Sequence, residues 1–296
     1  MNIQPIDTLT AQQKALESCS EEIFITQVME PLEDLWKPFM GRFPQDTDAH
    51  PALSAATMMG YYTPEDGCKA GLEALQTFEE ADSWQACVRA AEGALELLNS
   101  AAHGVEIDPI QFTLVLGSLR SLDLAYGAYT GVQQPGIAVV TGYPNPLGTP
   151  RLPVASAHEI HHIVRFAYEP FMPDLTLGKY IVAEGLAEAF GLEVVGDASL
   201  VGPYCTALTP EEVESVKPRF RDAVNESDFG VVRGYVFGDW AAEQFHYPKQ
   251  GVPDFAGYTL GYELVRAFLE RTGTSIVEAS YLPWQEIVEG SGYFGT

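Results

Sequence analysis

The chain has no run of apolar residues that approaches the roughly 18 needed for a membrane-spanning helix. Its amino-terminal residues also lack a basic segment followed by an apolar one, which is the pattern of a signal peptide. Both absences lead us to expect a protein of the cytoplasm that does not enter a membrane.

Basic residues are scarce. Lysine and arginine together number 16, against 41 aspartate and glutamate residues, and the net charge is −25. Binding of nucleic acid or of an anionic membrane requires a basic surface, so the composition argues against both as partners. It favours basic or neutral binding partners, but only mildly at physiological salt. The sequence does not indicate an oligomeric state.

Cysteines are few and scattered. Cys19, Cys68, Cys87 and Cys205 form no CxxC pair. In a reducing compartment, such residues are expected to be free thiols that pack as small apolar side chains. The sequence therefore predicts neither a cysteine-zinc site nor a disulfide framework.

The composition and the order of the segments indicate an α+β fold that is predominantly helical with a small β-sheet. Apolar residues make up 46% of the chain, which is ample for a buried core. Two short β-rich runs, 111–116 and 136–141, follow a helical amino-terminal part and precede a helical carboxyl-terminal half. We expect a helical region over 1–104 and a zincin-like metallohydrolase domain over 105–296. The two parts can also pack together as one compact unit.

Local signals predict several helix boundaries. Pro31 and Pro38 should interrupt the segment that opens at Ser20. A capping residue, a proline and two acids at 63–66 predict a helix that starts there and ends near Phe78. The last long helix should run from Tyr258 to Arg271, and Gly273 follows it.

Three of the six histidines fall within residues 157–162, where the sequence reads HExxH. Positions i and i+4 of a helix share a face, so His158 and His162 can hold one metal ion while Glu159 reaches a water molecule. The predicted helix is apolar on nearly every side and should be buried. Core histidines bonded to carbonyl groups are the alternative, which the cost of burying two imidazoles and a carboxylate disfavours. His161 should turn away from the metal.

A third ligand is available on the next predicted helix. Glu184 and Glu188 are again i and i+4, and their neighbours are too apolar for a fully exposed helix face. A carboxylate on a helix packed antiparallel to the HExxH helix can complete a site of two histidines and one glutamate. Catalytic zinc sites use such a set and keep a fourth position for water.

These residues carry a resemblance to known proteins. HExxH followed by a ligand glutamate on a second helix resembles the gluzincin pattern of thermolysin-like and aminopeptidase-type proteases. More specifically, the chain resembles a bacterial family of predicted Zn-dependent proteases that is catalogued as a domain of unknown function. The resembling elements cover a zincin-like core within 105–296, and they are 158–162, 184–188, 257–265 and 286–294.

The resemblance implies a role for each candidate residue. His158, His162 and Glu184 hold Zn²⁺, which lowers the pKa of a bound water to about 7. Glu159 acts as the general base. Glu188 matches the acid that supports a ligand histidine by accepting its other ring N–H.

The reaction also needs a hydrogen-bond donor for the oxyanion that forms during hydrolysis. Tyr258 is the first candidate, and Tyr262 and His246 are the next. Tyr258 and Tyr262 are i and i+4, so an aromatic stripe packed on the core is an equally good interpretation of the pair.

The sequence thus predicts a zinc-dependent metallohydrolase, most simply a peptidase with a peptide or protein substrate. Two alternatives stay open: hydrolysis of a non-peptide amide, and a zinc-stabilised binding or regulatory protein without turnover. Glu159 argues against the second, because a structural zinc site needs no base. An extended peptide is expected to add to a sheet edge formed by 111–116 or 136–141.

Overall fold

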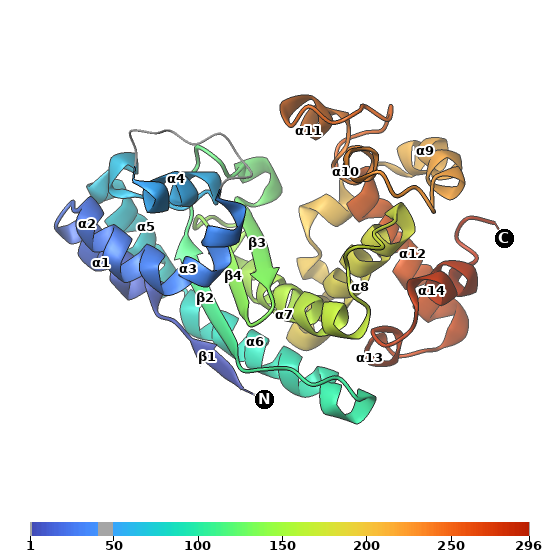
Figure 1. Ribbon diagram of the computed structural model, residues 1–296, viewed down its shortest axis with the longest axis horizontal. Coiled ribbons are helices and arrows are strands. Elements are labelled where there is room, and N and C mark those ends of the chain that lie inside the picture. Colours follow the sequence, from blue (N-terminus) through green and yellow to red (C-terminus); the bar gives the residue numbers. More distant parts are fainter. Residues whose placement is uncertain (1, 41–49, 296) are drawn as a thin grey trace. The chain divides into compact units, whose positions relative to one another are not determined.

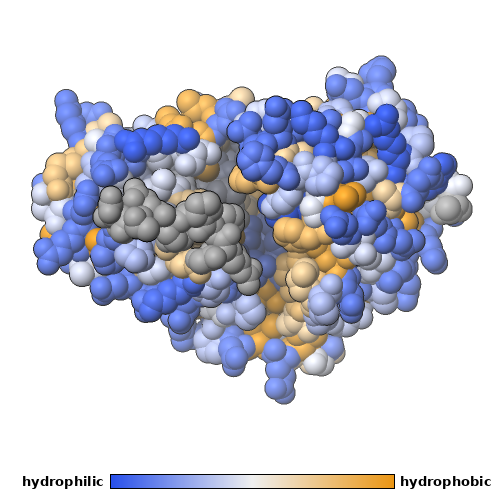
Figure 2. Space-filling model, turned by 45° about the horizontal axis from the view of Figure 1, so that its top comes forward, coloured by the Kyte–Doolittle hydropathy of each residue, from blue (hydrophilic) through white to orange (hydrophobic). Residues whose placement is uncertain are grey.

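The computed structural model describes residues 2–40 and 50–295. The chain packs as two compact units, one formed by 1–96 with 107–163 and the other by 97–106 with 164–296. The predicted division of the chain into 1–104 and 105–296 stays a prediction. Among the described helices, none combines the length and the apolar character that crossing a bilayer requires. On the face drawn in Figure 2, hydrophilic residues predominate, as the high charge of the chain leads one to expect.

The first unit contains a four-stranded sheet and the helices around it (Figure 1). Its strands are β1 (Ile3–Pro5), β2 (Ile110–Leu116), β3 (Tyr129–Gln134) and β4 (Ile137–Gly142). Its main helices are α1 (Thr8–Glu17), α2 (Glu21–Phe24), α3 (Glu33–Trp36), α4 (Pro51–Met58), α5 (Cys68–Glu80), α6 (Ser83–Leu98) and the first part of α7 (Leu152–Tyr168), whose residues from Val164 on belong to the second unit.

The segment from α2 to the turn after α3 confirms the effect of the two prolines. A π-helical turn, Ile25–Met29, is followed by a 3₁₀ turn, Glu30–Leu32, that contains Pro31. Pro38 lies in a second 3₁₀ turn directly after α3. Each proline lacks an N–H for the α-helical ladder, so the helix breaks where the sequence predicts.

Both predicted strands exist, but neither forms a sheet edge. The strand order is β1-β2-β4-β3, with β2 parallel to β1 and β4 and with β3 antiparallel to β4. The expectation of a sheet edge at 111–116 or 136–141 is therefore wrong, because strands on both sides use the hydrogen bonds of these two segments. In the described sheet, β1 and β3 are the edges.

The two faces of the sheet bury different partners. Val115, Ile137 and Val139 belong to a core cluster with side chains from α1, α2, α3 and α4. Phe112, on the opposite face, stacks against Trp84 of α6 with ring centroids 6.2 Å apart. Alternate residues of a strand point to opposite faces, so this unit has an apolar layer on each side of the sheet.

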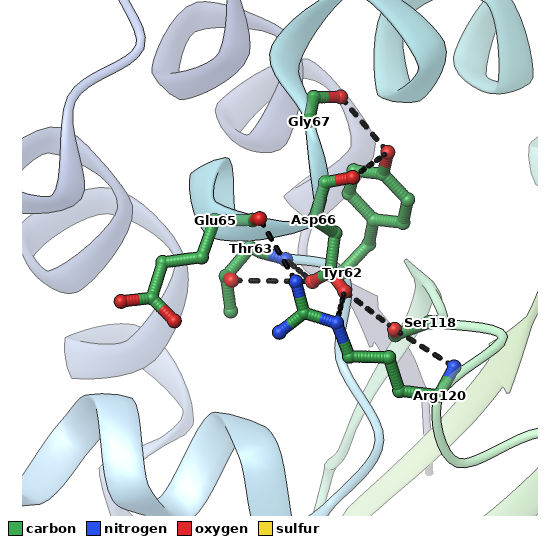
Figure 3. A network of polar contacts seen from close by, with 7 residues as sticks. All are labelled: Tyr62, Thr63, Glu65, Asp66, Gly67, Ser118 and Arg120. Atoms are coloured by element: carbon green, nitrogen blue, oxygen red, sulfur yellow. Dashed lines mark hydrogen bonds and ion pairs between the residues drawn. The ribbon is translucent and has the colours of Figure 1, made fainter.

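A polar network fixes the segment that follows β2 (Figure 3). The Asp66 carboxylate accepts hydrogen bonds from Ser118 Oγ at 2.7 Å and from the Thr63 backbone N–H at 2.8 Å. Arg120 Nε lies 3.0 Å from the same carboxylate. Residues 63–66 thus form a capped 3₁₀ turn, and the α-helix predicted to start there begins only at Cys68, after Gly67 with φ +115°.

The cysteine prediction is wrong for two of the four residues. Cys19 and Cys68 form a disulfide, with Cα atoms 5.8 Å apart across 49 positions of sequence. Packing of α1 against α5 brings them together, which their spacing in the sequence does not reveal. Cys87 and Cys205 are buried free thiols, as predicted, and burial raises the pKa of Cys87 to about 12.

The second unit is helical. It contains α8 (Leu177–Val195), α9 (Pro210–Asp222), α10 (Phe229–Phe237), α11 (Asp239–Gln244), α12 (Ala256–Thr272), α13 (Ile276–Ala279) and α14 (Trp284–Ser291) (Figure 1). The prediction of a last long helix closed by Gly273 is confirmed, since α12 ends one residue before this glycine, which has φ +71°.

Two glycines explain how closely α8 and α12 approach each other. A Cβ atom on Gly185 would lie 2.2 Å from the carbonyl oxygen of Gly261, and a Cβ atom on Gly261 would lie 2.2 Å from that of Ile181. Neither position has room for a side chain. The backbones therefore touch where α8 carries its two conspicuous acids, Glu184 and Glu188, and where α12 carries Tyr258 and Tyr262.

Arg165 anchors the carboxyl-terminal segment to the end of α7. Its side chain is buried, and Nη1 donates to the carbonyl oxygens of Ser280 and Leu282, each at 2.8 Å. Its partner carboxylate is Glu169, one turn later. Burial lowers the pKa of Arg165, and the nearby Glu169 charge opposes that shift. The guanidinium thus serves as a structural anchor.

Candidate metal centre

The HExxH segment lies on α7, as the sequence predicts. A 3₁₀ turn that contains Pro150 precedes this helix, which ends at Tyr168, two residues before Pro170. Ala157, Ile160 and Val164 are fully buried, so the predicted burial of this helix is confirmed. The rings of His158 and His162 meet edge to face with centroids 4.6 Å apart, which places both imidazoles on one side of the helix.

Glu184 completes a group that can hold a metal ion. One ligand atom from each of His158, His162 and Glu184 lies within 4.8 Å of the others. Two imidazole nitrogens and one carboxylate oxygen are the donor set that catalytic zinc sites use. The residues therefore fit zinc both in chemistry and in proximity, and the buried apolar neighbours of His162 limit the solvation that would compete with a metal.

Glu159 is buried on the same helix and lies against strand β3. A Cβ atom placed on Gly131 would lie 2.2 Å from Glu159 Oε1 and 2.5 Å from its carboxyl carbon. Gly131 pairs with Val140 of β4. A side chain at position 131 would therefore point to the same side of the sheet as the Val140 side chain. Only a glycine leaves room here for the Glu159 carboxylate.

Glu188 lies one turn beyond Glu184 on α8 and is buried. Its Oε1 accepts a hydrogen bond of 2.6 Å from the backbone N–H of Gly202. Close by is Cys205, whose pKa is raised by burial and further by the charges of Glu188 and Glu184. The contact with Gly202 fixes one of the two carboxylate oxygens of Glu188. Support of a ligand histidine by Glu188 stays a prediction.

Tyr258 belongs to an aromatic cluster beside Glu184. Its ring centroid lies 5.6 Å from that of Phe237 and 6.0 Å from that of Tyr204. Burial raises the pKa of Tyr258 well above its ordinary value, and the Glu184 charge raises it further. The hydroxyl thus keeps its proton at neutral pH and can donate a hydrogen bond, as an oxyanion donor must.

The other sequence candidates have different surroundings. Tyr262 lies one turn after Tyr258; burial raises its pKa, Arg266 lowers it, and Glu188 and Cys205 raise it. His246 is exposed in the segment after α11 and has φ +57°. His161 is fully buried, and its ring centroid lies 6.3 Å from that of His162. Tyr258 as the oxyanion donor, ahead of Tyr262 and His246, stays a prediction.

Two residues of the site escaped the sequence analysis. Gly131 carries no motif, and only the strand pairing brings it to Glu159. For Cys205 the sequence predicts packing alone, although the charges of Glu188 and Glu184 both raise its pKa. The signal in the sequence is weak in each case, because it depends on contacts between segments that are far apart along the chain.

Comparison with known proteins agrees with this site. A family described as "Predicted Zn-dependent protease (DUF2268)" matches residues 83–289, a range that contains all three proposed ligands. The chain is also 31% identical over 287 residues to the "Uncharacterized protein YjfC" of Bacillus subtilis (strain 168), covering 95% of this chain and 94% of that protein. No solved structure matches the chain.

Proposed function

We propose that this chain, which belongs to the family of predicted Zn-dependent proteases, is a gluzincin-type zinc peptidase that cleaves peptide bonds with Glu159 as general base. The observation that carries the proposal is the convergence of His158, His162 and Glu184, with the buried Glu159 beside the two histidines on one helix. A structural zinc site usually has four protein ligands and needs no base beside the metal.

The residues divide the work of hydrolysis. A zinc ion held by His158, His162 and Glu184 would supply Lewis-acid chemistry and lower the pKa of a water molecule to about 7. Glu159 accepts a proton from the attacking water and then delivers it to the amine nitrogen that leaves. The Tyr258 hydroxyl donates a hydrogen bond to the carbonyl oxygen as negative charge develops on it.

The position of Glu159 also indicates where an extended substrate lies. Strand β3 is an edge of the described sheet, and its Gly131 touches the Glu159 carboxylate. A peptide that adds to the outer side of β3 gains backbone hydrogen bonds without demanding a particular side-chain sequence. The scissile bond of such a peptide would pass close to the general base.

Glu159→Gln tests the mechanism, because it keeps the shape of the side chain and removes the base. Zinc content should stay at that of the wild type, while peptide turnover falls by about 100-fold or more. Glu193→Gln is a matched control, since Glu193 is exposed on α8 and should tolerate the same change.

The metal assignment is tested separately by elemental analysis. His162→Ala should lower the zinc content, because it removes one of three ligands. Wild-type peptide turnover in Glu159→Gln, or an unchanged zinc content in His162→Ala, would contradict the proposal.

A further inference from the structure

Arg233 is held between aromatic rings on α10. Its guanidinium carbon lies 4.5 Å from the ring centroid of Phe237 and 5.5 Å from that of Phe229, the residues one helical turn on either side. Tyr247, from the segment after α11, contributes a third ring at 5.6 Å. Stacking on aromatic faces restricts a long side chain and holds its planar fork of donors in place.

Arg233 is half-buried, and it lacks the partners that a partly desolvated cation normally has. Its Nε is buried without a hydrogen bond, and within residues 2–40 and 50–295 no carboxylate forms an ion pair with it. Arg266 is a useful contrast, since it stacks over Tyr262 at 5.9 Å but binds the Glu270 carboxylate at 2.9 Å. In a chain with 41 acidic residues, an aromatic-held arginine without a carboxylate partner calls for an explanation.

Arg233 contacts the aromatic cluster that includes Tyr258 of the candidate site. The Phe237 ring, which stacks on the guanidinium, lies 5.6 Å from that of Tyr258 and 6.3 Å from that of Tyr180. Tyr180 is i−4 to Glu184 on α8, so the cluster extends to the face that carries this proposed ligand. Electrostatics agree, because Tyr258 senses both Glu184, which raises its pKa, and Arg233, which lowers it.

We infer that Arg233 binds a carboxylate of the substrate and thereby selects peptides that carry one near the scissile bond. The inference rests on the proposed function, whose substrate class it narrows. A guanidinium presents paired N–H donors that match the two oxygens of a carboxylate, and such bonds are the strong ones. The carboxylate can be the free carboxyl terminus of a peptide or the side chain of an aspartate or glutamate.

The acidic surface does not conflict with a carboxylate ligand. Repulsion from the net charge of −25 acts at long range and is screened beyond about 8 Å at physiological salt. The contact with Arg233 is short and partly shielded from water by three rings. A peptide with one well-placed carboxylate and otherwise neutral or basic residues satisfies both conditions.

The test measures binding in the Glu159→Gln background, so that the peptide is not consumed. Calorimetry would compare three versions of one peptide: free carboxyl terminus, amidated terminus, and amidated terminus with an added aspartate. The first and the third distinguish the two sources of the carboxylate. Arg233→Gln should weaken binding of the carboxylate-bearing peptide by about 10- to 100-fold and leave the amidated peptide unchanged.

Two further variants separate recognition from folding. Arg233→Lys keeps the cation but loses the fork, so its affinity should fall between those of wild type and Arg233→Gln. Arg266→Gln removes an arginine that stacks but already has its carboxylate, and it should not change the preference. Unchanged zinc content and thermal unfolding of Arg233→Gln would show that the fold is intact.

Each outcome has one meaning. Equal binding of acid and amide by the protein with Arg233 intact, or an equal loss for both peptides in Arg233→Gln, would overturn the inference. If the preference depends on Arg233 but the wild-type protein cleaves no peptide, the carboxylate site stands and the proposed peptidase function fails. If peptides are cleaved with no preference for a carboxylate, only the inference about Arg233 fails.

Discussion

Replacement of Gly131 by alanine is the sharpest perturbation that the structure offers. The added methyl group would lie 2.2 Å from Glu159 Oε1, whereas ordinary contacts begin at 3.4 Å. The carboxylate must therefore move by about 1.2 Å, the difference between these distances. A displacement of about 1 Å at a reacting group can cost about 100-fold in rate, so we expect turnover to fall by that factor.

The same change should hardly affect stability. Overpacking costs about 1–3 kcal/mol, and the group that must yield is the end of a flexible side chain, which places the cost at the lower end. Replacing glycine by alanine lowers the conformational entropy of the unfolded chain and thereby stabilises the folded state by about 0.4–1 kcal/mol. The net loss in the free energy of unfolding is therefore at most about 0.6 kcal/mol, which shifts the melting temperature by no more than a few degrees.

A double-mutant cycle distinguishes positioning of the base from general damage. If Gly131 acts through Glu159, Gly131→Ala should lower kcat in the wild type but have little further effect once Glu159→Gln is present. Thr130→Ala is the matched control, because Thr130 is the exposed neighbour on the same strand. Equal losses in both backgrounds, or a wild-type rate with the methyl group in place, would refute the argument.

Three further predictions follow from single contacts. Tyr258→Phe should lower turnover by about 10- to 1000-fold at unchanged zinc content, as measured by peptide hydrolysis and elemental analysis. Burial raises the pKa of Tyr281 from 10.0 to about 12, so its contribution to stability is complete below pH 10 and declines up to pH 12. Between these pH values, the free energy of unfolding measured in urea should therefore decline less steeply for Tyr281→Phe than for the wild type. The two slopes should differ by up to about 1.4 kcal/mol per pH unit. Titration of the denatured, unreduced protein should find two reactive thiols if Cys19 and Cys68 are joined, and four if they are free.

Local patterns in the sequence were sufficient for much of the fold. The i, i+4 spacing of His158 and His162 and that of Glu184 and Glu188 depend only on helix geometry, so the ligand group could be predicted before any tertiary contact was known. Pro31 and Gly273 mark an interruption and a helix end for equally local reasons. The short β-rich runs identified β2 and β4, since buried strands are continuous apolar segments.

Features that depend on pairing between distant segments could not be predicted in this way. Strand β3 alternates weakly, and β1 contains only three residues, so neither stands out from its surroundings. Without them, the sequence places one of the runs 111–116 and 136–141 at the edge of the sheet, whereas both lie at its centre. The Cys19–Cys68 disulfide has the same origin, because only the packing of α1 against α5 brings the two sulfurs together.

Arg233 lies between these two cases. The sequence shows Phe229 and Phe237 at i−4 and i+4 from this arginine. A helix brings residues with this spacing into contact. What the sequence cannot show is that the guanidinium lacks a carboxylate and that the Phe237 ring reaches Tyr258. The ligand group predicts the chemistry because zinc ligands obey helix spacing, whereas recognition of a substrate depends on which donors tertiary packing leaves unused. For that reason, residues 158–188 predict the reaction class and the net charge predicts only a mild preference for basic or neutral peptides, whereas the hypothesis of a carboxylate subsite depends on the contacts of α10.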